Sequence, residues 1–268
     1  MMLIQIICYL IGGALSGLLA GLLGIGGGLV VVPFLVFALP YAGFPETHLM
    51  HVAVATSLAN IVVTSIVSFY SHHRRNAVLW RVVNRINISC IVGAAAGAVL
   101  AIWLPSHILS LIFGIFVFFI AYLLLRPQTL EQKNRTLPPP VQLNSSAFGI
   151  ATFCSLLGMG GGSLMVPFLN YYGISMRESI GTSAACGFFI ALSGLVCLML
   201  LQLHVSTSIH WMIGYLYLPA FLCMSVASVA FAPLGAKLAH TLPVPLLKKI
   251  FAGFLVIVGI SMFYKSIF

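Results

Sequence analysis

LLGIGGGLVVVPFL, residues Leu22–Leu35, returns almost unchanged as LLGMGGGSLMVPFL, residues Leu156–Leu169. The two segments start 134 residues apart in a chain of 268, and ten of their fourteen positions are identical. An internal match at half the chain length indicates a duplicated unit. Each copy places a glycine cluster and a proline inside apolar sequence, and in transporters such paired interruptions mark where the substrate is held.

The composition is that of a membrane protein. The chain is 61% hydrophobic and 6% charged, with a mean hydropathy of +1.15, whereas globular chains are about half apolar and about a quarter charged. Apolar stretches of adequate length for a membrane span recur along the chain. We expect spans at Val52–Tyr70, Ile86–Leu104, His107–Leu125, Gly181–Leu201, Trp211–Phe231 and Leu246–Phe263. The first residues lack the positive region and cleavage pattern of a signal peptide, so we expect them to be retained.

The longest polar interval, Arg126–Asn144, is too short to bury a core and contains three consecutive prolines, which is typical of a connection. We predict a first membrane repeat at residues 1–125, a cytoplasmic linker at residues 126–144 and a second membrane repeat at residues 145–268. The predicted fold is an all-α polytopic membrane protein. In each repeat a broken or re-entrant glycine-rich hairpin precedes three transmembrane helices. Because this makes five segments, an odd number, the repeats are expected to be inverted.

The basic residues favour this arrangement. The chain has 12 Lys and Arg against 3 Asp and Glu. In a soluble protein this excess suggests nucleic acid, but in a membrane protein it sets orientation, because short cytoplasmic loops collect positive charge. Five segments per repeat put eleven of the twelve inside, leaving only Lys265 outside. Four segments would move Arg177, Lys237, Lys248 and Lys249 outside, leaving eight inside. The loops Pro40–His48 and Leu203–His210 are accordingly predicted to lie outside.

The arms of the second hairpin are short. Ser145–Leu157 and Ser163–Ser175 have thirteen residues each, about 20 Å of helix against a hydrocarbon core of about 30 Å. Neither arm spans alone, whereas Met1–Leu23 in the first repeat is long enough to cross. Broken backbone at this depth is tolerated only where it is buried in protein or lines a wet cavity.

The glycine clusters are the candidate binding site. Glycine allows backbone angles closed to other residues and leaves no side chain between backbone and ligand. A helix that begins just after such a turn presents unpaired N–H groups and the positive end of its dipole, which together favour an anion. A proline farther along each arm frees a carbonyl and kinks the arm. The alternative is that the glycines only let helices approach closely. The candidates are Gly24, Gly26, Gly27, Gly28 and Pro33, then Gly158, Gly160, Gly161, Gly162 and Pro167.

A second repeated motif follows each glycine cluster. The pairs Thr56-Ser57 and Thr182-Ser183 open the first full span of their repeats, and Asn60 lies one turn beyond Thr56. One interpretation is that these side chains add hydrogen-bond donors to the same anion site. The other is that each hydroxyl bonds back to the preceding turn of its own helix, a frequent structural use.

Other kinds of site are disfavoured. The chain has no aspartate, and its three glutamates fall in predicted loops or at span ends, so none is placed to relay protons within the membrane. The glycine pattern lacks the lysine and the serine or threonine of a nucleotide-binding loop. The six cysteines have no metal-ligand spacing and are interpreted as small buried residues. We therefore predict that the chain is not an enzyme, and we expect no cofactor, no metal site and no catalytic residue.

At these residues the chain resembles the sulfite exporter TauE/SafE family, whose members are duplicated membrane proteins with G-x-G-G-G followed by a proline in each half. Here the pattern is Gly24-Ile25-Gly26-Gly27-Gly28 with Pro33, and Gly158-Met159-Gly160-Gly161-Gly162 with Pro167. The later Thr-Ser pairs fit as well, and the resemblance covers essentially the whole chain. It implies a multi-pass permease of the plasma (inner) membrane for sulfite, sulfonates or related sulfur oxyanions.

The leading functional hypothesis is a secondary carrier or facilitator that exports a small anion of this kind. With the cell interior negative, an outward-moving monovalent anion gains about 2.3 kcal/mol per 100 mV, so export needs no ATP. The alternative is a non-transporting membrane scaffold or subunit whose glycines serve packing. The expected partners are a small anionic substrate and the lipid bilayer, with no nucleic acid. The sequence leaves open the anion, the direction of transport, the coupling ion, the oligomeric state and whether the glycine-rich hairpins fully cross the membrane.

Overall fold

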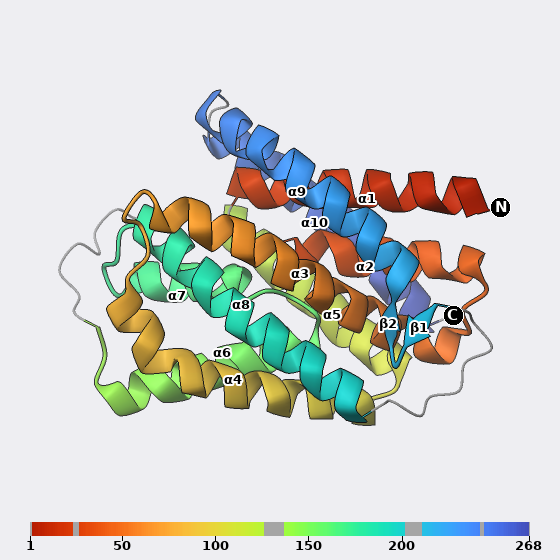
Figure 1. Cartoon of the computed structure of the whole chain (residues 1–268), viewed down its shortest axis with the longest axis horizontal. Helices are drawn as coiled ribbons and strands as arrows, with labels where there is room; N and C mark the ends of the chain where they lie inside the picture. Colours follow the sequence, from red (N-terminus) through yellow and green to blue (C-terminus); the bar gives the residue numbers. More distant parts are fainter. Residues whose placement is uncertain (1, 24–26, 126–136, 202–210, 242–243, 268) are drawn as a thin grey trace.

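The computed structural model describes residues 2–23, 27–125, 137–201, 211–241 and 244–267. Within these ranges the chain forms ten α-helices, five in each half (Figure 1). The first half contains α1 (Met2–Leu23), α2 (Gly28–Ala38), the 3-10 helices η1 (Leu39–Ala42) and η2 (Glu46–His48), α3 (Leu49–His73), α4 (Trp80–Trp103) and α5 (Ser106–Leu125). The second half contains α6 (Pro140–Leu156), α7 (Gly162–Tyr171), α8 (Met176–Leu201), β1 (Met212–Ile213), β2 (Leu216–Tyr217), α9 (Leu218–Thr241) and α10 (Val244–Ile267).

The predicted all-α polytopic fold is confirmed. Within the described residues, α1, α3, α4, α5, α8 and α9 are long and apolar enough to cross a membrane. The short arms are also present, because α2 has 11 residues and α7 has 10, lengths of about 16 and 15 Å. Neither helix crosses a hydrocarbon core of about 30 Å by itself.

Some element boundaries differ from those expected. The first arm of the second hairpin begins at Pro140 instead of Ser145, because the fixed φ of proline suits the first turn of a helix. The span predicted at Trp211–Phe231 was wrong at its start, since the segment up to Tyr217 forms the small β1–β2 hairpin and α9 begins at Leu218. The positive φ of Gly214 accommodates the turn of that hairpin. Leu203–His210 and the linker residues 126–136 lie outside the described residues.

The two glycine-bearing hairpins open toward opposite ends of the molecule (Figure 1). The α1–α2 hairpin starts and finishes at one end, where the Gln5 side-chain amide donates to the Tyr41 carbonyl at 3.0 Å. Lys265 lies at this end, which we call the Lys265 end. The α6–α7 hairpin starts and finishes at the other end, where Leu143 packs with Val78 and Val82 in one core cluster. We call this the arginine end, because Arg74, Arg75, Arg81, Arg85 and Arg177 lie there.

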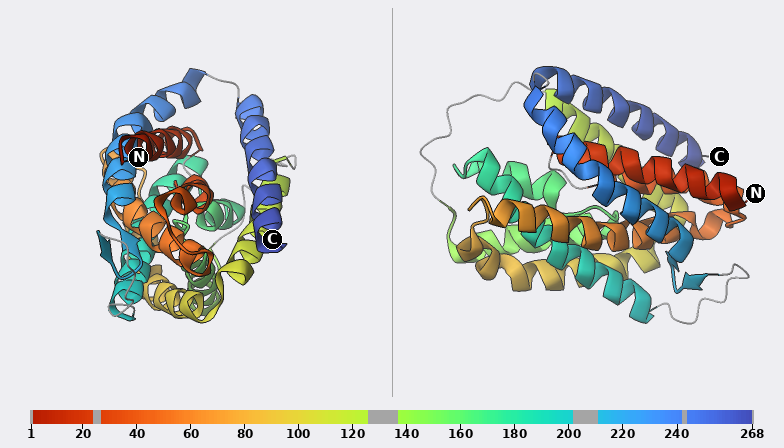
Figure 2. Two further views of the ribbon diagram at one scale, coloured as in Figure 1. Left: turned by 90° about the vertical axis from the view of Figure 1, so that its right-hand side faces the viewer. Right: turned by 45° about the horizontal axis from the view of Figure 1, so that its top comes forward.

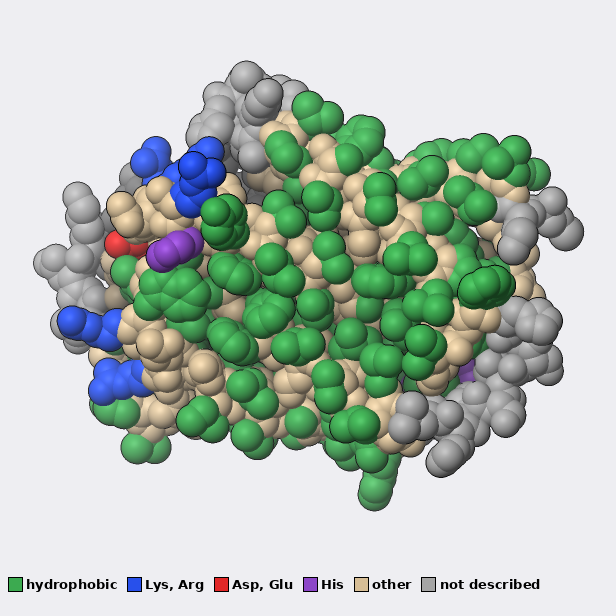
Figure 3. Space-filling model, in the orientation of Figure 1, with side chains coloured by type: hydrophobic (Ala, Val, Ile, Leu, Met, Phe, Trp, Pro, Cys, Tyr) green, Lys and Arg blue, Asp and Glu red, His purple; other side chains and the backbone are tan. Residues whose placement is uncertain are grey.

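The surface divides in the same way. On the face drawn in Figure 3, the Lys and Arg side chains gather at the arginine end, and apolar side chains cover the long middle of the molecule. Burying charge in hydrocarbon is costly, so a bilayer would surround this apolar middle.

The helix contacts repeat when the halves are exchanged. α1 packs along α9, and α6, the counterpart of α1, packs along α4, the counterpart of α9. α3 packs against α8, and α5 lies beside α10, so these counterparts pair with each other (Figure 2). A pattern that is unchanged when the halves are exchanged is the one that inverted repeats would give. The repeat boundaries and the inversion of the halves across the bilayer stay predictions.

Small residues bring these helices together. A Cβ on Gly13 of α1 would lie 2.5 Å from the Met224 carbonyl oxygen of α9, and one on Gly93 of α4 would lie 2.5 Å from the Phe148 carbonyl oxygen of α6. Gly17 and Gly97, each four residues farther on, meet the carbonyls of Ser228 and Thr152. This spacing lets two backbones approach closely in a membrane.

The orientation of the halves can be measured by thiol labelling from outside the cell. We expect a cysteine at exposed Thr47 to react with a membrane-impermeant maleimide, and cysteines at exposed Ser71 and Gln142 to react only after permeabilisation. The parent protein with its native cysteines gives the background. Labelling of Thr47→Cys and Gln142→Cys from the same side would rule out inverted repeats.

Candidate functional site

The tips of the two hairpins touch in the middle of the protein. A Cβ placed on Gly28 would lie 2.7 Å from the Gly158 carbonyl oxygen and 2.8 Å from the Cα of Met159. Both turns are enclosed by protein, since Gly27, Gly28 and residues 158–162 are buried. Of the predicted site residues, Gly24 and Gly26 lie outside the described residues. The structure thus brings together the described parts of two motifs that are far apart in the sequence.

The tip of the second hairpin is a Schellman turn. Gly158 has a φ of +67°, its N–H donates to the Ser155 carbonyl at 3.1 Å, and the Met159 N–H donates to the Cys154 carbonyl at 2.8 Å. This 6→1 and 5→2 pair of bonds ends a helix at a left-handed residue, which is usually glycine. A Cβ on Gly158 would also lie 2.8 Å from the Cα of Val54 in α3. Gly158 is therefore required both by its φ and by the close approach of α3.

Two helices begin at these tips. Gly27 is the N-cap of α2 and Gly161 is the N-cap of α7, and neither helix has a side-chain cap. The first N–H groups of a helix have no acceptor within the helix, and they carry about half a positive elementary charge. The start of α2 contacts the Gly158–Met159 turn, and α7 begins three residues after that turn, at Gly162.

The prolines act within the arms. Pro33 and Pro167 lie inside α2 and α7, where each removes the N–H that would bond the carbonyl four residues earlier, at Leu29 and Ser163. Pro33 is buried, whereas Pro167 is exposed. Because Pro167 is exposed, its side chain lies apart from the buried tips.

The threonines of the Thr-Ser pairs hold equivalent helix starts. The Thr56 hydroxyl accepts the N–H of Tyr217, the residue before α9, at 3.2 Å. The Thr182 hydroxyl accepts the N–H of Leu79, the N-cap of α4, at 3.0 Å. The two bonds are counterparts when the halves are exchanged. Both threonines bond across the protein instead of to the preceding turn of their own helix.

The serines of the two pairs differ. The Ser57 hydroxyl donates to the Gly158 carbonyl at 2.7 Å, which ties α3 to the tip of the second hairpin. Ser183 is fully buried and its hydroxyl has no hydrogen-bond partner. A buried hydroxyl without a partner is costly, so Ser183 is a donor available to a ligand.

Asn60 joins a buried polar cluster beside the first tip. Its side-chain oxygen accepts from the Ser225 hydroxyl of α9 at 3.0 Å, while its amide nitrogen has no partner. That nitrogen lies 3.8 Å from where a Cβ on Gly27 would be. The Ser16 hydroxyl of α1 donates to the Gly27 carbonyl at 3.3 Å. The cluster therefore joins α1, α2, α3 and α9 and leaves one amide donor free.

The second tip has its own small polar groups. Ser163, in the first turn of α7, is 5% exposed and its hydroxyl has no partner. A Cβ on Gly187 of α8 would lie 3.6 Å from both the Gly161 nitrogen and the Ser65 hydroxyl oxygen. Sequence reasoning did not select Ser16, Ser65, Ser163 or Ser225. A small polar residue inside an apolar helix was the available signal, and for Ser163 so was its place directly after the glycine cluster.

Comparison with known proteins identifies the family. The sequence profile described as "Sulfite exporter TauE/SafE" matches residues 9–262. The chain belongs to the sulfite exporter TauE/SafE family. A "Probable membrane transporter protein" of Haemophilus influenzae is 36% identical over 97% of this chain and 98% of its own length. Another of Methanocaldococcus jannaschii is 26% identical over 94% and 93%, and YunE of Bacillus subtilis is 26% identical over 96% of both chains. No solved structure matches the chain.

Membership of the TauE/SafE family confirms the resemblance found in the sequence. The chain is a multi-pass membrane protein of a transporter family, in line with a plasma-membrane location. The family profile spans both hairpin tips and all of the polar groups described around them.

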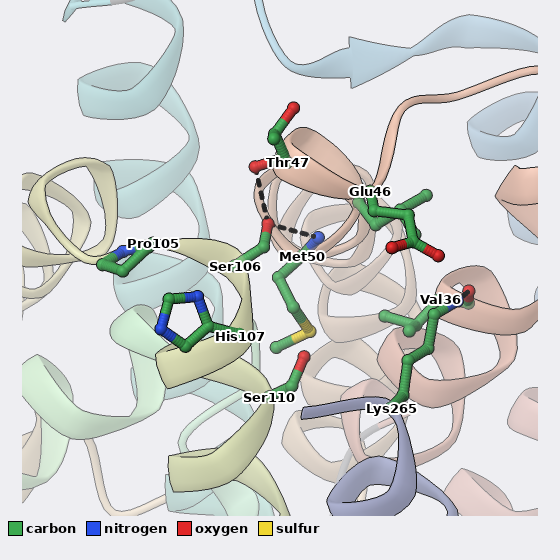
Figure 4. A pocket seen from close by; sticks show the side chains of 10 residues that line it. Val36, Glu46, Thr47, Met50, Pro105, Ser106, His107, Ser110 and Lys265 are labelled. Atoms are coloured by element: carbon green, nitrogen blue, oxygen red, sulfur yellow. Dashed lines mark hydrogen bonds between the residues drawn. The ribbon is translucent and has the colours of Figure 1, made fainter. Parts of the chain in front are cut away.

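A separate pocket lies at the Lys265 end of this TauE/SafE protein (Figure 4). It is a cavity of about 310 Å³ lined by residues that include Glu46, Ser106, His107 and Lys265. The Lys265 ammonium donates to the Val36 carbonyl near the end of α2 at 2.7 Å. Pro40 stands where the next helical N–H donor to Val36 would be, so Lys265 supplies the bond that proline cannot. Lys265 therefore anchors the outer end of the half-length helix α2.

The tip geometry predicts a difference between two glycines near each other in sequence. Gly158→Ala should lower the melting temperature in detergent, because a left-handed φ costs alanine about 1–2 kcal/mol and its Cβ would press on α3. Gly149→Ala in α6, where a Cβ meets nothing within 4 Å, should leave stability unchanged or raise it, since alanine favours helix. Equal melting temperatures for the two variants would contradict the tip described here.

Proposed function

We propose that this chain is a secondary carrier or facilitator that exports a small anion, a sulfite, sulfonate or related sulfur oxyanion, across the plasma membrane. The observation that carries the proposal is the contact, inside the protein, between Gly28 at the start of α2 and the Gly158–Met159 turn that precedes α7. The proposed substrate is held between the two tips by backbone N–H groups and by the free donors of Asn60, Ser163 and Ser183.

Electrostatics supports an anion at this point. Each helix N-terminus carries about half a positive elementary charge, and two such ends repel each other in a low-dielectric interior. A monovalent anion between them offsets both ends together. It also accepts hydrogen bonds from the buried groups that have no partner in the protein, and bonds to a charged acceptor are the stronger kind.

Hairpins that open to opposite ends support alternating access. The α1–α2 hairpin reaches the tips from the Lys265 end, and the α6–α7 hairpin reaches them from the arginine end. Movement of one hairpin would expose the tips to one side while the other hairpin keeps the second side closed. The membrane potential, negative inside, then favours outward release of a monovalent anion by about 2.3 kcal/mol per 100 mV.

The alternative is a scaffold whose glycines serve packing alone. The close approach of Gly28 to Gly158 favours it, because any side chain at Gly28 would separate the tips. Substitutions of the tip glycines therefore cannot distinguish the carrier from the scaffold, since both hypotheses predict a damaged protein. Substitutions of the unpartnered donors can distinguish them, because those groups make no contact that packing needs.

Transport is tested directly with purified protein in liposomes. We expect sulfite or a sulfonate loaded inside to leave faster than from protein-free liposomes, and to leave faster still when the inside is made negative. Chloride is the comparison anion. Purified, folded protein that moves none of the tested sulfur oxyanions would refute the proposal.

The two serines of the Thr-Ser pairs separate binding from packing. Ser183→Ala removes an unpartnered buried hydroxyl, so the melting temperature should stay the same or rise. Sulfur-oxyanion flux should fall about tenfold or more, the effect of losing one hydrogen bond to a charged group. Ser57→Ala is the matched control and should lower stability, because it leaves the buried Gly158 carbonyl unpaired. If Ser183→Ala transports at the parent rate, its hydroxyl is not part of the site.

A further inference from the structure

Three helices carry a second set of side chains on the Lys265 side of the tips. On α1, Tyr9 precedes Ser16 by seven residues, which places it on the same face about 10 Å nearer that end. On α3, Thr56 precedes Asn60 by one turn. Tyr217 immediately precedes α9, whose Ser225 bonds to Asn60. Three of the four helices of the buried polar cluster, α1, α3 and α9, thus have one of these side chains on their Lys265 side, with Tyr217 directly before α9.

These side chains contact one another. The Tyr217 N–H donates to the Thr56 hydroxyl at 3.2 Å. The Tyr217 ring meets Tyr9 edge-on, with centroids 6.1 Å apart, and meets Phe44 edge-on, with centroids 5.0 Å apart. Tyr9, Phe44 and Tyr217 are 2%, 4% and 8% exposed. Three rings from α1, β2 and the loop between η1 and η2 therefore close this side of the protein, and we call them the aromatic cluster.

The Tyr9 hydroxyl is the unusual group in this cluster. It is buried and has no hydrogen-bond partner, although buried tyrosine hydroxyls usually find one. The ring packs well, so phenylalanine would fill the same space without the cost of the unpaired hydroxyl. A ligand that binds there during part of the transport cycle accounts for the group that the resting protein leaves unpaired.

We propose that Tyr9 forms a second binding station for the transported oxyanion, between the glycine tips and the Lys265 end, and that the aromatic cluster is the closed gate of this station. This inference rests on the proposed function and adds a residue and a direction to it. The phenolic O–H is a neutral donor, like the backbone N–H groups and the serine hydroxyls of the tips. A dehydrated anion leaving the tips therefore meets another donor before it reaches water.

Phe44 lies outside the long helices, on the loop between η1 and η2, and follows Gly43, whose φ is +86°. A Cβ on Gly43 would meet nothing within 4 Å, so glycine is required there by its backbone angle and not by close packing. Removing the Phe44 ring should therefore open the gate without disturbing the tips.

The first test removes one atom. Tyr9→Phe should leave the melting temperature unchanged or higher and should lower sulfur-oxyanion flux in liposomes about fivefold or more, the loss expected for one hydrogen bond to the anion. Tyr41→Phe is the matched control, since Tyr41 is 83% exposed at the same end of the protein, and it should transport at the parent rate. Parent-level flux in Tyr9→Phe would overturn the inference while leaving the proposed function in place.

The second test needs no transport. Cys223 lies on α9 six residues beyond Tyr217 and packs against the core cluster that contains Tyr9, Phe44 and Tyr217. Phe44→Ala should speed the reaction of Cys223 with an impermeant maleimide added at the Lys265 end, as located by peptide mass spectrometry. Unchanged labelling would overturn the gate. Faster labelling in a protein that moves no sulfur oxyanion would keep the gate and refute the proposed substrate instead.

Discussion

The close approach of two backbone turns inside the protein is the constraint on which the remainder of the structure depends. Gly28 lies so near the second tip that a Cβ on it would meet main-chain atoms of Gly158 and Met159, and a Cβ on Gly158 would meet the main chain of Val54 in α3. Main-chain groups brought together without water must each find a partner. Ser57 supplies one for the Gly158 carbonyl and Ser16 one for the Gly27 carbonyl. The buried groups around the tips that remain without a partner are hydrogen-bond donors, and an excess of donors suits an anion.

The helix contacts that repeat when the halves are exchanged explain how the two tips can meet. Because α1 packs on α9 while α6 packs on α4, the first arm of each hairpin is held by a helix of the other half of the chain. This packing uses glycines spaced four apart, at Gly13 and Gly17 and at Gly93 and Gly97, which meet carbonyls of the facing helix. These glycines serve packing, and the glycines of the tips serve both packing and the proposed binding. The two interpretations of glycine in this sequence are therefore true of different positions.

The halves are not chemically equal. Ser57 is bonded and Ser183 is free. Four residues after the threonine of each Thr-Ser pair the first half has Asn60 and the second has Cys186, which is buried in an apolar cluster. The polar cluster of Ser16, Asn60 and Ser225 joins residues of both halves. It is centred on an amide that the second half lacks at this position, and the aromatic cluster lies on its Lys265 side. The proposed exporter has to bind its substrate on one side and release it on the other, and unequal halves would provide that difference.

The sequence by itself determined the duplication, the all-α membrane fold, the short arms and the family. Composition, the lengths of apolar stretches and the glycine motif can each be read from short stretches of sequence. The sequence also selected Asn60 and Ser183, yet it gave Thr56, Thr182 and Ser57 the same status. Only the tertiary structure distinguished them, because a hydroxyl's role depends on which distant backbone group lies within hydrogen-bonding distance of it. For Thr56 that group is 161 residues away in sequence, and for Ser57 it is 101 residues away. The unpaired hydroxyl of Tyr9 and the meeting of the tips likewise follow from packing between halves, which local sequence does not encode.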